Sequence, residues 1–316
     1  MEEDIAILKA AEELSRASKS TRVRYHHPRI HLVLPKICRG KVKEIDDLLN
    51  YIQGLDVSVE TADAWSPSSH TGCLMIEDVV GGMVPGNFSC LSSTVNVDCT
   101  ILLAIVSDLS NTHVIKEPWL HTAAKRQIEM EEEQNLLPSV LFPVMGNHTL
   151  VCTYEAATRM QEIVNTIGTR SEMARTEALL STSNLSHGDR LTKYARLSNH
   201  IIPPDWQLPV QVINDFNPLT PELPSIANVV SGELSDLNRS VFLFGWQKGY
   251  TTITSNRTTA KRIQTLIEES LVPGTNDVLG PDIWVCQTAR SLRAKDKIRG
   301  LAVPRNESNL GFGQGY

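Results

Sequence analysis

The sequence predicts an α/β fold with a mostly parallel central sheet, because short β-branched strands alternate with helical patterns over most of its 316 residues. Residues 94–97 and 149–153 are strand-like runs, and each is followed directly by a helical pattern. A third run, residues 250–256, precedes another helical pattern over residues 259–269. This alternation is typical of α/β proteins whose strands run parallel to one another.

The first 90 residues predict a smaller, mainly helical region that precedes the sheet. Apolar residues at helical spacing indicate helices over residues 4–18 and 42–52. Two short extended pieces, residues 30–34 and 57–61, have the pattern of strands. Glycine, serine and proline are frequent over residues 62–93 and are typical of turns, so we place a domain boundary near residue 90.

The rest of the chain contains one long segment without this pattern. Residues 182–238 are rich in proline and polar residues and have poor apolar periodicity, so we expect a loop-rich insertion there. The domain with the sheet should extend over residues 91–300. Residues 291–299 are basic and are either a solvated end or a stretch that faces RNA. The last residues, 301–316, should form a disordered tail.

Composition excludes several classes of protein. The net charge is −6, so a nucleic-acid surface would have to be a local patch rather than the whole molecule. We expect no membrane segment and no signal peptide, hence a cytoplasmic or nuclear location. The six cysteines form no C-x-x-C pair and no histidine pair has zinc-ligand spacing, so we expect reduced thiols and no zinc site.

Asp98 is the residue around which a functional site is expected. It follows the strand at residues 94–97, and carboxyl ends of strands are where open α/β sheets bind ligands. Thr100 is suited to cap the helix that follows. If the strand that ends in Thr254 is a neighbour, Asp98 and Asn256 would face each other across the sheet edge, a pair suited to Mg²⁺. The alternative is that Asp98 only caps its helix.

The order of these motifs resembles the PIN-domain ribonuclease fold. The resemblance rests on a hydrophobic strand, Asp98-x-Thr100, a leucine-rich helix and, much later, a strand that ends in Thr254-x-Asn256. More specifically, residues 94–300 are similar to the domain-of-unknown-function 1308 family, a group of uncharacterised eukaryotic PIN-like proteins. Further similarity lies in Phe244-Gly245 and in Leu32-Val33-Leu34-Pro35 of the N-terminal region.

The resemblance implies a three-layer α/β/α domain with an acidic cleft, in which active members hold Mg²⁺ or Mn²⁺ with three or four carboxylates. This sequence departs from that pattern at three positions. Arg159 occupies the expected place of a helical acid, Trp246-Gln247-Lys248 follows Phe244-Gly245 without an acid, and Asn256 is an amide. The implied catalytic residues are Asp98, Glu155 and Glu162, the binding residues are Thr100, Thr254 and Asn256, and the metal ligands are Asp98 and Asn256.

Two hypotheses of function follow from these observations. The first is a degenerate PIN-like domain that serves as a binding or scaffold module for RNA or a protein partner. The alternative is a ribonuclease that uses Mg²⁺ or Mn²⁺, with Asp98 and one or two acids from Glu155, Glu162, Glu172 and Glu177. A Rossmann-type nucleotide site is disfavoured because no G-x-G-x-x-G follows the strand at residues 94–97.

Overall fold

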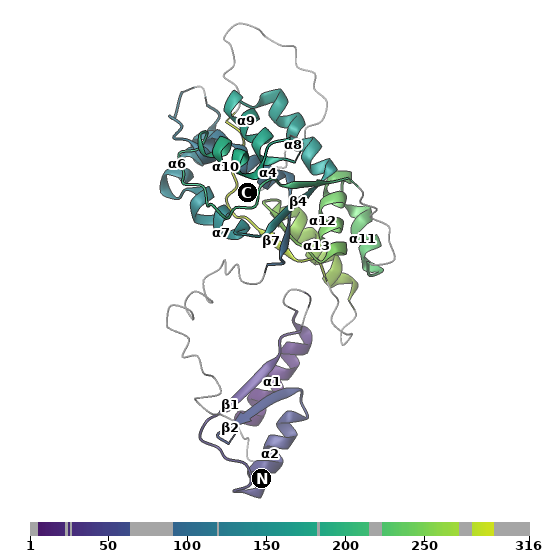
Figure 1. The fold of residues 1–316 in the computed structure, drawn as a ribbon. Coiled ribbons are helices and arrows are strands. Elements are labelled where there is room, and N and C mark those ends of the chain that lie inside the picture. Colours follow the sequence, from purple (N-terminus) through teal and green to yellow (C-terminus); the bar gives the residue numbers. More distant parts are fainter. Residues whose placement is uncertain are drawn as a thin grey trace.

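The computed structural model describes most of the chain between Ala6 and Arg293 (Figure 1). The described residues are 6–22, 25, 27–63, 91–118, 120–181, 184–214, 223–271 and 280–293. The predicted tail at residues 301–316 and the predicted boundary near residue 90 lie outside the described residues.

The described residues of the N-terminal part form two helices and two paired strands. β1 (Ile30–Leu34) lies parallel to β2 (Val57–Thr61), and α2 (Lys43–Gln53) connects them. With α1 (Ala6–Ser20) they enclose a small apolar core of their own. The helices and extended pieces expected here are therefore present, and the two extended pieces pair as a sheet. The buried residues of this core are Ala11, Ile52 and Val57.

The central sheet has five parallel strands in the order β5-β4-β3-β6-β7. This confirms the predicted α/β fold with a parallel sheet, and β3 is the central strand with β6 beside it. The strands are β3 (Thr94–Val97), β4 (Thr149–Thr153), β5 (Gln211–Ile213), β6 (Thr251–Thr254) and β7 (Ile283–Val285).

Helices flank this sheet in a three-layer α/β/α arrangement (Figure 1). In the described part of the chain, no helix is both long and apolar enough to cross a membrane. The helices are α4 (Cys99–Val106), α5 (Asp108–Asn111), α6 (Thr122–Glu133), the π-helical turn η2 (Leu137–Leu141), α7 (Phe142–Met145), α8 (Tyr154–Ile167), α9 (Arg170–Leu179), α10 (His187–Ala195), α11 (Ile226–Glu233), α12 (Asp236–Lys248) and α13 (Arg257–Ser270).

β3 and α4 form the centre of the main hydrophobic core. Val95 and Val97 of β3 are fully buried, as are Ile101, Leu102 and Ile105 of α4. Each fully buried aliphatic side chain contributes about 1.5–3 kcal/mol relative to exposure. The apolar burial of these two consecutive elements fixes the position of Asp98, which lies between them.

α12 packs unusually close to the sheet through Gly245. A Cβ atom at Gly245 would overlap the Thr252 hydroxyl of β6, so a larger residue would push the helix away. Nδ2 of Asn96 donates to the carbonyl of Val241 in α12 (2.9 Å) and to Oγ1 of Thr252 (3.0 Å). The close contact holds α12 over β3 and β6.

The interval 182–238 contains more regular structure than its composition predicts. It includes α10, the edge strand β5, α11 and the start of α12. Tyr194 and Trp206 are fully buried, and their rings pack edge to face with centroids 5.1 Å apart. Our expectation of a loop-rich insertion underestimated the amount of regular structure in this interval. The reason is that its buried side chains are spaced irregularly and give no periodic signal.

A buried polar network joins α5 to α9. Nη1 of Arg175 lies 2.8 Å from Oδ1 of Asp108, and both side chains are almost fully buried. The hydroxyls of Thr169 and Ser171 also donate to this carboxylate, at 2.7 and 2.6 Å. Glu172 accepts the backbone N–H groups of Asp108, Thr169 and Arg293. Because these partners come from three separate segments, the network fixes the corner after α4 and the chain after β7.

The pKa of Asp108 is lowered in this network. Burial alone would raise it, but hydrogen bonds from Ser171 and Thr169 and the adjacent Arg175 guanidinium reverse the direction. A carboxylate with a lowered pKa stabilises the fold above its ordinary pKa, and this contribution disappears as the pH falls through the lowered value.

We expect Arg175→Met to lower the free energy of unfolding by about 3–5 kcal/mol at pH 7, because it leaves the Asp108 charge buried without its cation. The loss should become smaller as the pH falls below about 4, the ordinary pKa of an aspartate, toward the lowered pKa of Asp108. Urea denaturation at pH 7 and at pH 3 measures both effects. Arg196→Met, at the exposed end of α10, is the matched control and should change stability by less than about 0.5 kcal/mol. Equal losses in the two variants would contradict this assignment.

Candidate functional site

The carboxyl ends of β3 and β6 meet where the strand order of the sheet reverses. From β3 the chain continues to β4 and β5 on one side, and it then returns to β6 on the other side of β3. Open α/β sheets bind ligands outside the carboxyl ends of their strands at such a switch point. Asp98 directly follows β3 and Thr254 ends β6, so both residues lie where a ligand site is expected.

The Asp98 carboxylate accepts hydrogen bonds from two threonine hydroxyls. Oγ1 of Thr100 and Oγ1 of Thr254 each lie 2.6 Å from its Oδ2 atom. The same hydroxyls accept the backbone N–H groups of Ser255 (3.0 Å) and Asn256 (2.9 Å). Asp98 is only 3% exposed. The network therefore joins the end of β3, the first turn of α4 and the turn after β6 into one buried polar unit.

Burial raises the pKa of the Asp98 carboxyl above its usual value of 3.8, although the hydrogen bonds from Thr100 and Thr254 oppose the shift. Asp98 occupies the position before α4, but its side chain makes no capping hydrogen bond to that helix. Burial and the negative charge of Asp98 raise the pKa of the neighbouring Cys99 thiol to about 12. Cys99 is therefore a neutral thiol near pH 7 and not a nucleophile.

Four helices begin at this edge of the sheet. α4 starts after Asp98, while Thr153 and Asn256 cap α8 and α13 through their side-chain oxygens. Ser235 caps α12, and Asn238 in its first turn donates to the Thr259 hydroxyl of α13 (3.3 Å). The amino ends of helices carry partial positive charge and free N–H groups. This edge is therefore suited to anionic groups.

The other two acids expected at the site have local partners. Glu155 lies in the first turn of α8, is exposed, and accepts a hydrogen bond from the Ser240 hydroxyl of α12 at 2.5 Å. Glu162 lies two turns further along α8 and forms an exposed ion pair with Arg159 at 3.1 Å. Asp98, by contrast, is buried beside the threonines. No hydrogen bond or ion pair between the described residues joins any two of the three predicted catalytic residues.

Asn256 is not oriented as the expected metal ligand. Its Oδ1 atom accepts the backbone N–H of Thr259 (3.1 Å), and its Nδ2 atom lies 3.5 Å from Oδ1 of Asn238. Thr254, two residues earlier, contacts Asp98 instead. The prediction that Asp98 and the Thr254–Asn256 segment meet at one edge is correct, but the residue that faces Asp98 is the threonine.

The residues of this edge do not fit a divalent cation. Mg²⁺ and Mn²⁺ require several oxygen ligands, usually with more than one carboxylate among them. Across the described ranges, no three histidine, cysteine, aspartate or glutamate side chains come close enough together to hold a metal ion. Oδ2 of Asp98 is occupied by two hydroxyl donors.

A cavity of about 360 Å³ lies beside this network and was not predicted from the sequence. It is bounded by Ser255 after β6, by residues of α6, and by the segment after β7. Arg126 of α6 contributes a cation to its lining. Sequence patterns alone give no signal for this cavity, because α6 and the end of β7 are separated by about 150 residues of chain. The lining residues are Ala123, Arg126, Gln127, Met130, Ser255, Gln287, Thr288 and Ala289.

Part of the chain matches a known family model. Residues 95–200 match the model of the family described as "Protein of unknown function (DUF1308)". This confirms the resemblance to that family over β3, β4 and the helices between and after them, which include Asp98, Glu155 and Glu162. No match was found among curated proteins or among solved structures.

We expect the stability of Asp98→Asn, measured relative to that of the wild type, to increase as the pH rises from 4 to 7. A carboxyl whose pKa is raised by folding favours the folded state below its unfolded pKa, and this advantage is lost as the pH rises through the folded value. The neutral amide avoids the cost of burying the ionised form, and its oxygen still accepts the threonine hydroxyls. Melting curves at pH 4, 5, 6 and 7 measure the difference.

The control for this series is Asp205→Asn, which changes an exposed carboxyl in the loop before β5. Its stability difference from the wild type should stay nearly constant with pH. A wild type that becomes more stable than Asp98→Asn as the pH rises would show that the fold favours the ionised carboxylate, contrary to our assignment.

Proposed function

We propose that residues 91–293 form a PIN-like domain that binds RNA at the carboxyl edge of its sheet without cleaving it. The resemblance to PIN domains implies a three-layer α/β/α fold with an acid after the first strand of the sheet. The parallel sheet and the position of Asp98 after β3 support this proposal. The observation that carries it is the state of Asp98, which is buried and bonded to hydroxyls rather than grouped with other acids.

Metal-dependent phosphodiester cleavage needs carboxylates that hold the cation which activates water and stabilises the leaving oxygen. Here Asp98 is engaged by threonines, Glu155 by Ser240 and Glu162 by Arg159. Each of these three acids already has a partner. Binding without hydrolysis is therefore the function that this arrangement supports best.

RNA is favoured over a protein partner because the groups at this edge suit phosphate. Four helix amino ends converge there, and such ends bind phosphate through their free N–H groups. Arg126 lines the cavity beside Ser255, and Arg257 is the first residue of α13. Phosphate contacts of this kind supply most of the affinity for single-stranded RNA and make it depend on salt.

We expect the full chain to bind a labelled ten-nucleotide single-stranded RNA with an affinity that falls as salt increases. Arg126→Glu should weaken binding about fivefold, the equivalent of roughly 1 kcal/mol for one ion pair near water. Arg196→Glu carries the same change of charge on a residue that lines neither of the cavities described here, and it should have little effect. Fluorescence anisotropy measures both, and melting curves establish that the variants are folded.

The same RNA incubated with millimolar Mg²⁺ or Mn²⁺ tests the alternative. We expect no cleavage above that of Asp98→Asn and no rise in melting temperature with either ion. Cleavage that requires the ion and is lost in Asp98→Asn would establish a ribonuclease instead. Absence of RNA binding at low salt would overturn the proposal and leave a protein partner as the remaining hypothesis for this edge.

A further inference from the structure

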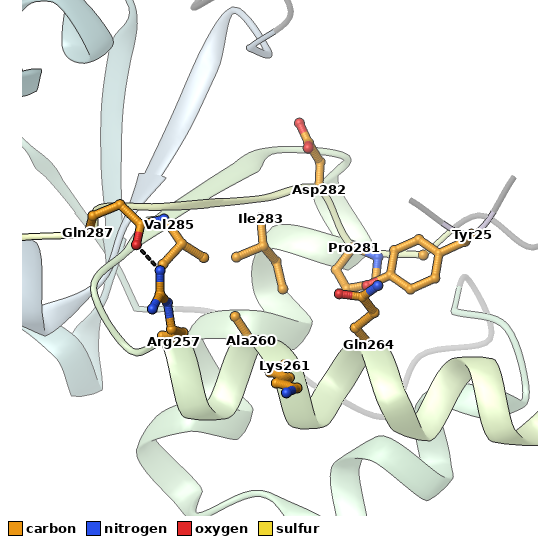
Figure 2. A pocket seen from close by; sticks show the side chains of 11 residues that line it. Tyr25, Arg257, Ala260, Lys261, Gln264, Pro281, Asp282, Ile283, Val285 and Gln287 are labelled. Atoms are coloured by element: carbon orange, nitrogen blue, oxygen red, sulfur yellow. Dashed lines mark hydrogen bonds between the residues drawn. The ribbon is translucent and has the colours of Figure 1, made fainter. Parts of the chain in front are cut away.

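A second, larger cavity lies between α13 and β7. Its volume is about 780 Å³, within the range of 300–1,000 Å³ that is typical of small-molecule sites. Figure 2 shows α13 along one side of it and the strand with Ile283 and Val285 along the other. None of the residues predicted as functional lines this cavity.

One face of α13 gives the cavity a positive and polar wall. Arg257, Lys261 and Gln264 are spaced four and three residues apart, so they lie on the same side of the helix. The Arg257 guanidinium donates a hydrogen bond to Oε1 of Gln287, which closes one end of the cavity (Figure 2). Two cations and two amides therefore line the same cavity.

The two cations of this wall have no acidic partner among the described residues. No ion pair to Arg257 or Lys261 is formed by the part of the chain that the structure describes, whereas the adjacent Arg262 pairs with Glu233 at 3.0 Å. Among the described residues of the lining, the acid is Asp282, and its carboxylate accepts the Thr251 hydroxyl. In Figure 2 that carboxylate points away from α13. In a chain with a net charge of −6, the cavity is thus locally positive.

The remaining surface of the cavity is apolar. Ala260, Ile283 and Val285 line it between the helix and the strand, and the ring of Tyr25 stands near Pro281 at the end opposite Gln287 (Figure 2). Burial raises the pKa of Tyr25 to about 12, so its ring is neutral near pH 7. Apolar walls and an aromatic ring accept a flat ring system, and amides can bond its polar edge.

This cavity shares a lining residue with the smaller cavity beside the Asp98 network. Gln287 lines both this cavity and the one of about 360 Å³ at the sheet edge. Ser255 lines the smaller cavity, and its N–H donates to Thr100, which contacts Asp98. The described cations that line the two cavities are Arg126 in the smaller one and Arg257 and Lys261 in the larger one.

We infer that the cavity between α13 and β7 binds one nucleotide, with its phosphate at Arg257 and Lys261 and its base against Ala260, Ile283 and Val285. The inference deepens the proposed function in that the nucleotide can belong to a bound RNA strand. A free nucleotide has the same chemistry, and the two sources are separated by experiment.

The test compares two neighbouring cations on α13. Lys261→Glu should weaken binding of the ten-nucleotide RNA about fivefold or more, and it should reduce the slope of log affinity against log salt by about 0.7, the value for one phosphate contact on a single strand. Arg262→Glu has the same change of charge but a side chain paired with Glu233, and it should change the affinity less than about twofold. Melting curves establish that both variants are folded.

A third variant tests the apolar wall without a change of charge. Ala260→Leu keeps a good helix former and fills the space between α13 and β7. It should weaken RNA binding about fivefold or more, since stacking of one base contributes on this order. Calorimetric titration with a free nucleoside monophosphate completes the set. If the wild type binds the free nucleotide and Lys261→Glu does not, the free nucleotide is itself a ligand of this cavity.

The outcomes distinguish this inference from the proposed function. If Lys261→Glu and Arg262→Glu act equally and Ala260→Leu has no effect, the inference is wrong. If Arg126→Glu still weakens RNA binding in that case, the proposed function stands. If the chain binds a free nucleotide at Lys261 but no RNA, the inference stands and the proposed function is wrong.

Discussion

The common direction of the five strands in the central sheet is the constraint on which the other features depend. Because all five strands are parallel, their carboxyl ends lie at one edge, and α4, α8 and α13 begin there. The return of the chain from β5 to β6 makes β3 and β6 neighbours, which brings Asp98 and Thr254 together. The hydroxyl–carboxylate network follows from topology rather than from nearness in sequence.

Much of this arrangement could be predicted from local patterns. Two strands have the apolar sequence of buried strands: the one before Asp98 and the one that ends in Thr254. Parallel pairing then places their carboxyl ends at one edge of the sheet. The sequence could not predict which of Thr254 and Asn256 would face Asp98. That choice depends on where β6 ends, because Asn256 lies beyond the strand and caps α13 with its side chain, whereas Thr254 is the last residue of the strand and contacts Asp98.

Local sequence patterns also could not predict the long-range polar partners or the cavities. Arg175 pairs with Asp108, 67 residues away, and no periodicity indicates which of many cations a buried acid selects. The cavity along α13 could not be predicted for the same reason, because Lys261 and Val285 are brought together only when β7 pairs with β6. Such contacts arise from the assembled sheet, so they become visible only with the structure.

The chemistry of the carboxyl edge depends on which groups stabilise its charged side chains. In a metal-dependent nuclease, clustered carboxylates repel one another until a cation binds, so the empty site is negative and unstable. Here Asp98 is stabilised by Thr100 and Thr254, and it needs no cation to offset a neighbouring charge. Arg257 and Lys261, whose charges are positive, form no ion pair with any described residue. An edge compensated in this way attracts phosphate directly, which is the property of a binding surface rather than of a metal centre.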